Sequence, residues 1–209
     1  MNVDTPASIV EHGYDRIAEQ YLASNDRKDP ILLSALEELA LLIPASAAVL
    51  DLGCGAGVPV TQWLAERYEV TGVDISAQQS ELASALLPTV TVIKADMMTL
   101  DFPPDTFDAI VSFYAIIHVL RQKQPQLLRN ILCWLKPGGA FLATWAMTEW
   151  EGQEANWEGW GAPMWWSHYD AATNLNLMRA AGFEINSEQV RTTQNETWLW
   201  VLAQKPAAS

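Results

Sequence analysis

The chain has 209 residues, and its 25 acidic and 12 basic side chains give a formal net charge of -13. A chain of this length can bury a sizeable core without cross-links, and two cysteines make no disulfide framework. Uncharged runs such as residues 39–50 and 109–120 are shorter than the ~20 apolar residues of a membrane span. The negative charge repels nucleic-acid phosphates and anionic lipids. We therefore expect one cytoplasmic domain, a monomer or homodimer, that binds neither nucleic acid nor membranes.

Two helical segments are predicted at the N-terminus, residues 6–22 and 30–42, with a polar stretch at 24–29 between them. In the first segment Tyr14 and Tyr21 are spaced so that both lie on one helix face. Such a stripe can close over a ligand, and the alternative is that it packs against a sheet.

Short apolar runs alternate with helical patterns through the middle of the chain. The runs have the character of buried parallel strands and span residues 49–52, 69–73, 89–93, 107–113 and 139–145. Helical patterns span residues 59–67, 77–87 and 123–135, with a stop signal at 136–139. This alternation predicts a doubly wound α/β sheet with helices on both faces.

The last third of the chain predicts a helix and a hairpin. Asp170 is placed to cap a helix that ends at Gly182. Two strands follow, residues 183–190 and 197–203, joined by a polar turn at Gln194 and Asn195.

A glycine-rich loop, residues 51–57, lies between the first strand and the first helix of the sheet. Glycines at alternate positions let the backbone approach a ligand and direct N–H groups toward it. Val58 occupies the position where a dinucleotide fingerprint needs its third glycine, so that motif is absent. Asp74 ends the second strand and is placed to accept hydrogen bonds from a ribose. The alternative is a plain tight turn with a solvated Asp74.

Several motifs in order resemble the class I S-adenosylmethionine (SAM)-dependent methyltransferases, in particular their small-molecule branch. They are residues 49–57 (VLDLGCGAG), 70–76 (VTGVDIS), 95–97 (ADM), 102–112 (FPPDTFDAIVS) and 135–139 (LKPGG). The resemblance implies a seven-stranded sheet, mostly parallel, with an antiparallel C-terminal strand. It also implies SAM as the cofactor and S-adenosylhomocysteine (SAH) as its product.

The resemblance also implies which residues hold SAM. The glycine loop meets the methionyl part, Asp74 the ribose and Asp96 the adenine amino group. The implied cofactor-binding residues are Tyr14, Tyr21, Asp51, Gly53, Gly55, Asp74, Ile75, Asp96, Met97 and Phe113. From the residues alone, Asp51 can bind a ligand ammonium or only stabilise the loop, and Asp96 can be a helix N-cap.

Residues 112–119 (SFYAIIHV) follow the fourth strand. The resemblance implies that this segment lies beside the methyl acceptor. It lacks the Asn/Asp-Pro-Pro-aromatic motif typical of relatives that methylate nucleic acids. In small-molecule relatives an aromatic residue and a His stand here, which implies Tyr114 and His118 as catalytic residues. A neutral His could accept a proton from a hydroxyl, and the alternative is a His packed among apolar neighbours.

Six of the ten tryptophans lie within residues 145–166. Aromatic walls bind an apolar or aromatic acceptor, or stack on a cationic one. The alternative is that the indoles only anchor an irregular loop. The predicted acceptor-binding residues are Trp145, Trp165, Trp166, His168 and Tyr169.

Together these observations predict a single methyltransferase domain, residues 1–209, with an N-terminal lid (1–45) and an acceptor insertion (146–169). We expect it to methylate a small apolar or aromatic metabolite at oxygen, without a metal ion. Methylation at nitrogen or carbon is one alternative. A protein that binds SAM or SAH without methyl transfer is another.

Overall fold

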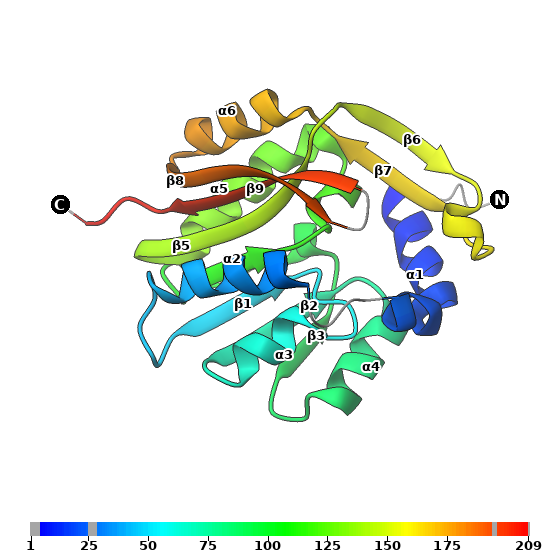
Figure 1. The fold of residues 1–209 in the computed structure, drawn as a ribbon, viewed down its shortest axis with the longest axis horizontal. Helices are drawn as coiled ribbons and strands as arrows, with labels where there is room; N and C mark the ends of the chain where they lie inside the picture. The colour runs from blue at the N-terminus through cyan, green and yellow to red at the C-terminus, as the bar shows by residue number, and fades with distance from the viewer. Residues whose placement is uncertain (1–4, 25–28, 194–195, 209) are drawn as a thin grey trace.

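The computed structural model describes residues 5–24, 29–193 and 196–208, and it contains a seven-stranded sheet of order β3-β2-β1-β4-β5-β9-β8 (Figure 1). The strands are β1 (Ala48–Leu52), β2 (Glu69–Asp74), β3 (Thr91–Lys94), β4 (Phe107–Ser112), β5 (Leu135–Ala146), β8 (Glu184–Thr193) and β9 (Glu196–Gln204). The first five are parallel, and β9 is antiparallel to both of its neighbours. The predicted sheet is therefore confirmed, while the predicted turn at residues 194–195 lies outside the described residues.

Helices cover both faces of this sheet. They are α1 (Pro6–Ser24), α2 (Pro30–Ala40), α3 (Val60–Ala65), α4 (Ala77–Leu86), α5 (Gln124–Trp134) and α6 (Ala171–Ala181). Leu50 and its strand neighbours face α5 and α6 in one buried cluster, and Val49 faces α2 and α3 in another. Successive side chains of a strand point to opposite faces, so the continuous apolar runs reflect a sheet buried on both sides.

Two segments differ from the prediction. Helix α5 ends at Trp134, as the stop signal predicts, but strand β5 begins directly after it at Leu135, so residues 136–139 already belong to the strand. Gly138, with φ +77°, lets the chain turn there, and Lys136 pairs with Asp108 at 2.8 Å. The acceptor insertion is also regular, because β6 (Trp150–Glu154) and β7 (Met164–His168) form a separate antiparallel hairpin.

The hairpin β6–β7 lies against α1, and Figure 1 shows both at the same end of the molecule. A side chain on Gly13 would put its Cβ 2.5 Å from the carbonyl oxygen of Pro163, so glycine is needed for this close approach. The Arg16 guanidinium donates to the Gly161 carbonyl oxygen at 3.0 Å. The contacts join the N-terminal helix to the insertion.

Among the described residues, no helix has the length and hydropathy to cross a membrane.

Candidate functional site

The carboxyl ends of the parallel strands border two cavities that share lining residues. The first cavity, of about 890 Å³, is lined by residues that include Asp74, Ile75, Gln79, Asp96, Met97 and His118. The second cavity, of about 1980 Å³ with its open mouth, is lined by residues that include Asp51, Tyr114, Glu154, Trp157, Trp166 and Trp198. Tyr14, Tyr21, Gly53, Gly55 and Phe113 line both. Ligands of α/β sheets bind at this edge.

The glycine loop brings its backbone to both cavities. Gly53 and Gly57 have φ +82°, and Gly55 has φ +54°, values that disfavour other residues. A Cβ on Gly53 would lie 2.2 Å from the Cβ of Ala115, so the loop also packs tightly against the segment after β4. The loop is a tight turn and a cavity wall at once.

Asp74 is held by the backbone and faces the first cavity. Its two carboxylate oxygens accept the N–H groups of Gly55, at 2.8 Å, and Ser76, at 2.9 Å. Burial raises the pKa of this carboxyl to about 6, although both backbone hydrogen bonds lower it. The remaining lone pairs can accept hydrogen bonds from a ligand, as the sequence predicted for a ribose.

Asp51 is more deeply buried than Asp74. Its carboxylate accepts the Thr61 hydroxyl at 2.7 Å, and it lines the second cavity beside the glycine loop. Burial raises its pKa to about 7, the Thr61 hydrogen bond lowers it, and the charge of Asp74 raises it further. Both sequence-based roles for Asp51 are therefore compatible with this position.

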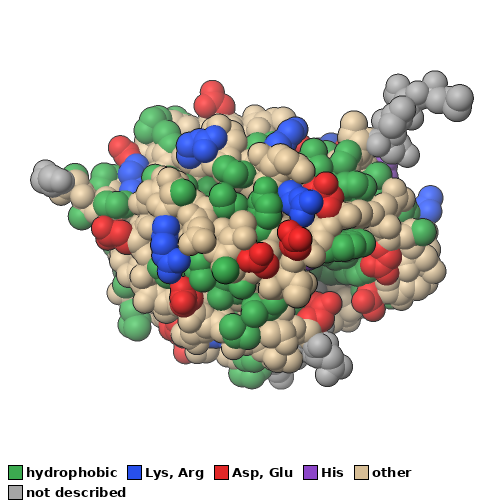
Figure 2. Space-filling model, turned by 90° about the horizontal axis from the view of Figure 1, so that it is seen from above, with side chains coloured by type: hydrophobic (Ala, Val, Ile, Leu, Met, Phe, Trp, Pro, Cys, Tyr) green, Lys and Arg blue, Asp and Glu red, His purple; other side chains and the backbone are tan. Residues whose placement is uncertain are grey.

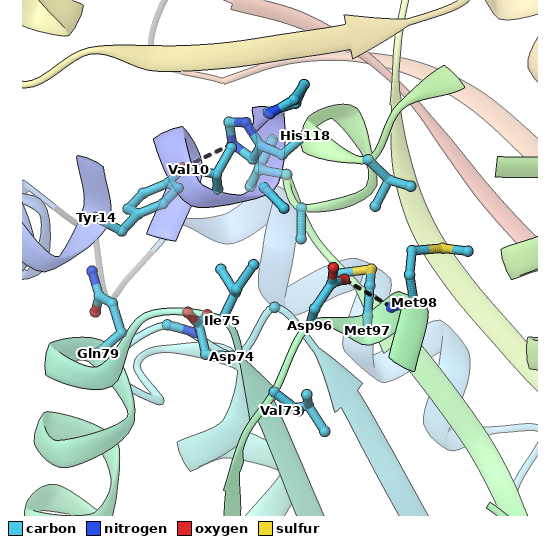
Figure 3. A pocket seen from close by; sticks show the side chains of 18 of the residues that line it. Val10, Tyr14, Val73, Asp74, Ile75, Gln79, Asp96, Met97, Met98 and His118 are labelled. Atoms are coloured by element: carbon cyan, nitrogen blue, oxygen red, sulfur yellow. Dashed lines mark hydrogen bonds between the residues drawn. The ribbon is translucent and has the colours of Figure 1, made fainter. Parts of the chain in front are cut away.

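Asp96 combines two roles that the sequence left as alternatives. Its Oδ1 accepts the N–H of Met98 at 2.9 Å and caps the short helix η1 (Met97–Thr99), and the same residue lines the first cavity. Ile75 and Met97 form apolar wall beside it, and Figure 3 shows these side chains around one space.

Gln79 is a lining residue that sequence reasoning missed. It is 1% exposed, and neither polar atom of its amide has a hydrogen-bond partner among the described residues. It lines the first cavity on the same side as Asp74 (Figure 3). A buried amide without partners is costly, so a ligand that pairs with it would be favoured. Its position one helical turn after the N-cap Ser76 is the sequence signal that could have located it.

Helix α1 is fixed over the first cavity by contacts to segments far along the chain. Asp15 accepts the Ser76 hydroxyl at 2.6 Å and the N–H of Gln78 at 3.1 Å. Tyr14 and Tyr21 pack edge to face, with ring centres 5.3 Å apart. They line both cavities, and their role as lid residues stays a prediction.

Tyr14 and His118 form a hydrogen bond across the first cavity (Figure 3). The Tyr14 hydroxyl and His118 Nε2 are 3.0 Å apart, and His118 Nδ1 is 2.7 Å from the Trp165 carbonyl oxygen. Because a carbonyl only accepts, Nδ1 carries the proton and Nε2 accepts from Tyr14. Burial lowers the pKa of His118 to about 4 and raises that of Tyr14 well above its ordinary value. The imidazole is therefore neutral and the phenol protonated near pH 7.

Tyr114, the other predicted catalytic residue, lies where the two cavities meet. Its φ of +55° is unusual for a bulky residue, and its N–H donates to the Thr144 hydroxyl at 2.7 Å. Strained backbone of this kind clusters at functional sites. The ring packs against Trp198, with ring centres 5.0 Å apart.

The predicted acceptor residues divide into two groups. Trp166 and His168 line the second cavity. Contrary to the prediction, Trp145 lies in the core beside Phe141, because β5 is buried on both faces. The side chains of Trp165 and Tyr169 line neither cavity, and the Tyr169 ring lies 5.6 Å from the Arg121 guanidinium. Four tryptophans that the prediction omitted do line the second cavity: Trp150, Trp157, Trp160 and Trp198.

Comparison with known proteins agrees with this geometry. Residues 49–139 match a family model described as a methyltransferase domain. Phosphoethanolamine N-methyltransferase 3 of Arabidopsis thaliana is 38% identical over 102 residues, which cover 46% of this chain and 20% of that protein. The chain thus spans about a fifth of the length of this curated relative.

Two solved structures show the same fold over nearly the whole chain. The [4+2]-cyclase SpnF superposes with a TM-score of 0.76 at 20% identity, covering 99% of this chain and 98% of that one. A 1,6-didemethyltoxoflavin-N1-methyltransferase of Burkholderia thailandensis, solved with 1,6-didemethyltoxoflavin and SAH, gives 0.73 at 19% identity, covering 99% and 92%. At these identities the likeness shows the fold. Residues 49–139 thus resemble a methyltransferase domain, within a fold that these structures share over nearly the whole chain.

Proposed function

We propose that this protein transfers a methyl group from SAM to oxygen of a small molecule with an apolar or aromatic body. The observation that carries the proposal is the pairing of the two cavities. One combines Asp74, Asp96 and the unpartnered amide of Gln79 with apolar walls, and the other is walled by indoles. They meet at the glycine loop and Tyr114.

The residues of the first cavity fit the chemical groups of SAM. Asp74 suits the ribose hydroxyls, and Asp96 suits the adenine amino group, with Ile75 and Met97 against the ring. Beside the glycine loop, which borders both cavities, Asp51 of the second cavity and the loop amides suit the ammonium and carboxylate of the methionyl part. When bound, SAM supplies a methyl group on a cationic sulfur.

His118 would act on the acceptor's proton late in the reaction. A free phenol has a pKa near 10, whereas the pKa of His118 is about 4, so removing the proton first would cost about 8 kcal/mol. An oxygen that is receiving a methyl group becomes strongly acidic, and its proton can then pass to neutral Nε2 through the Tyr14 hydroxyl, which gives its own proton to Nε2 as it takes the acceptor's. Tyr14, hydrogen-bonded to Nε2, is placed to orient the acceptor.

Orientation and water exclusion would supply much of the rate. Trp157 contacts both lid tyrosines, with ring centres 5.8 Å from Tyr14 and 5.9 Å from Tyr21. Lid and insertion thus cover the cavities together.

A second candidate is a SAM-binding protein without methyl transfer, and the likeness to a [4+2]-cyclase favours keeping it. Incubation with SAM and a metabolite extract, followed by mass spectrometry, separates the two. Methyl transfer produces SAH and a product 14 Da heavier. Tight SAM binding with neither product would favour the second candidate. With SAM labelled in its methyl group, the position of the label in the product shows whether oxygen, nitrogen or carbon was methylated.

Gln79→Leu should weaken SAH binding about 5- to 20-fold, because the buried amide would lose its ligand partners. Leu has a similar size and leaves no polar atom unpaired, so the free protein should be at least as stable as the parent. Calorimetric titration with SAH and thermal unfolding measure the two effects. Unchanged affinity in a folded variant would show that Gln79 does not contact the ligand.

SAH affinity should fall as pH is lowered from 8 to 5.5. The carboxyls of Asp51 and Asp74, with pKa values of about 7 and 6, take up protons over this range. A protonated Asp51 no longer pairs with an ammonium, and a protonated Asp74 accepts weaker hydrogen bonds from the ribose. Asp51→Asn should remove the inflection near pH 7. Calorimetry across this pH range measures both, and a flat profile for the parent protein would contradict the assignment.

The same two carboxyls should affect folding in the opposite direction. In the unfolded chain they ionise near pH 4, so between pH 4 and 7 the folded, ligand-free protein binds more protons than the unfolded one. Their contribution to stability therefore declines as pH rises through that window. Urea unfolding of the parent and of Asp51→Asn at several pH values measures it.

A further inference from the structure

The second cavity has an unusual combination of walls. Five indoles line it, from Trp150, Trp157, Trp160, Trp166 and Trp198. Trp157 lies at the centre of this group, with ring centres 5.4 Å from Trp160 and 5.5 Å from Trp166. Indole rings offer a negative face, which attracts cations.

Carboxylates share this lining with the indoles. Asp29 caps α2 by accepting the N–H of Ile31 at 2.8 Å, whereas Glu154, Glu158 and Glu196 form no ion pair within the described part of the chain. Figure 2 shows a hollow in the right half of the molecule, and acidic side chains lie around it.

Across residues 5–24, 29–193 and 196–208, the lining of the second cavity holds no Lys or Arg to balance these charges. Two other glutamates of the insertion, Glu149 and Glu151, do have a basic partner, because both pair with Arg121. All three of these residues lie outside the lining of the second cavity. A phosphate or carboxylate on the acceptor would therefore meet like charge, and a cation would meet opposite charge.

We propose that the methyl acceptor is an organic cation, carrying a protonated amine or a quaternary ammonium group. This inference rests on the proposed function of the same site. The charged group lies toward Glu154, Glu158 and Glu196, and the apolar body lies against Trp157 and Trp166.

Three compounds that share a phenol ring and differ in charge test the proposal. Tyramine is cationic, 4-ethylphenol is neutral and 4-hydroxyphenylacetate is anionic. Calorimetric titration of each into the SAH-saturated protein should show tyramine binding about tenfold more tightly than 4-ethylphenol. The anion should bind most weakly, and added salt should narrow the differences.

A matched pair of variants separates local from overall charge. The triple variant Glu154→Gln, Glu158→Gln, Glu196→Gln should abolish the preference for tyramine. The control triple variant Glu37→Gln, Glu81→Gln, Glu184→Gln changes net charge equally at exposed positions that line neither cavity, and it should retain the preference.

Three results would overturn the proposal: equal or tighter binding of the anion, a preference that survives the first triple variant, or no tyramine binding in the millimolar range. The methyl-transfer screen is a separate measurement. A cation preference without any methylated product would refute methyl transfer and leave the charge preference standing. Methylated products that are all neutral or anionic would refute the cation and keep the transferase.

Discussion

Replacing Asp74 with Ala should weaken SAH binding by about 1–3 kcal/mol, roughly 5- to 150-fold. The carboxylate would lose its hydrogen bonds to the ribose, and the N–H groups of Gly55 and Ser76 would lose the acceptor that now orders the loop. Asp74→Asn keeps the shape and one acceptor oxygen, so its loss should be smaller. Calorimetry with SAH measures both variants.

A control addresses the effect of charge on binding. Asp101 is exposed and lines neither cavity, so Asp101→Ala removes the same charge without touching the site. Its SAH affinity should match that of the parent. If Asp74→Ala unfolds at the parent's temperature and binds SAH as tightly as Asp101→Ala, Asp74 has no part in ribose recognition.

His118→Ala should reduce turnover of the acceptor about 100-fold and change SAH affinity less than threefold. Tyr14→Phe removes the same hydrogen bond and keeps the ring against Tyr21 and Trp157, so it should reproduce part of the loss without loosening the lid. The measurement is turnover of the acceptor found in the extract screen, with calorimetry for SAH.

Unfolding temperature measured beside turnover distinguishes a proton acceptor from a packing residue. His118 has a lowered pKa of about 4, so it stays neutral from pH 5.5 to 8, and its own titration should produce no acid limb there. Since the unfolded chain takes up a proton below about pH 6.5, His118 should cost stability as pH falls below that value. His12→Ala, at an exposed position, is the control. Parallel losses of unfolding temperature and turnover in His118→Ala would identify a packing role.

Much of the cofactor side could be predicted from the sequence because its residues are adjacent in the chain. Gly53 and Gly55 are constrained by backbone angles, and Asp74 follows a strand whose end reaches the sheet edge in any parallel arrangement. The position of Asp96 at the cavity could be predicted, but its role could not. The sequence offered a ligand contact and a helix cap as alternatives, and the same residue caps η1 and lines the first cavity.

The acceptor side was predicted less well, for a reason that Trp145 and Trp166 illustrate. Trp145 belongs to a strand with apolar residues on both faces, so alternation could not tell which face it occupies. Trp166 reaches the cavity because residues 150–168 form a hairpin against α1, which the irregular composition of the insertion did not predict.

By itself, the sequence determined the succession of strands and helices in the seven-stranded sheet, the glycine loop and the acids at the strand ends, because each depends on neighbouring residues. Only the tertiary structure decided that Tyr14 meets His118, 104 positions away, and that Gln79 is buried without a partner. It also decided which tryptophans line a cavity with Glu154, Glu158 and Glu196. Such contacts depend on how distant segments pack, and local periodicity carries no information about that packing.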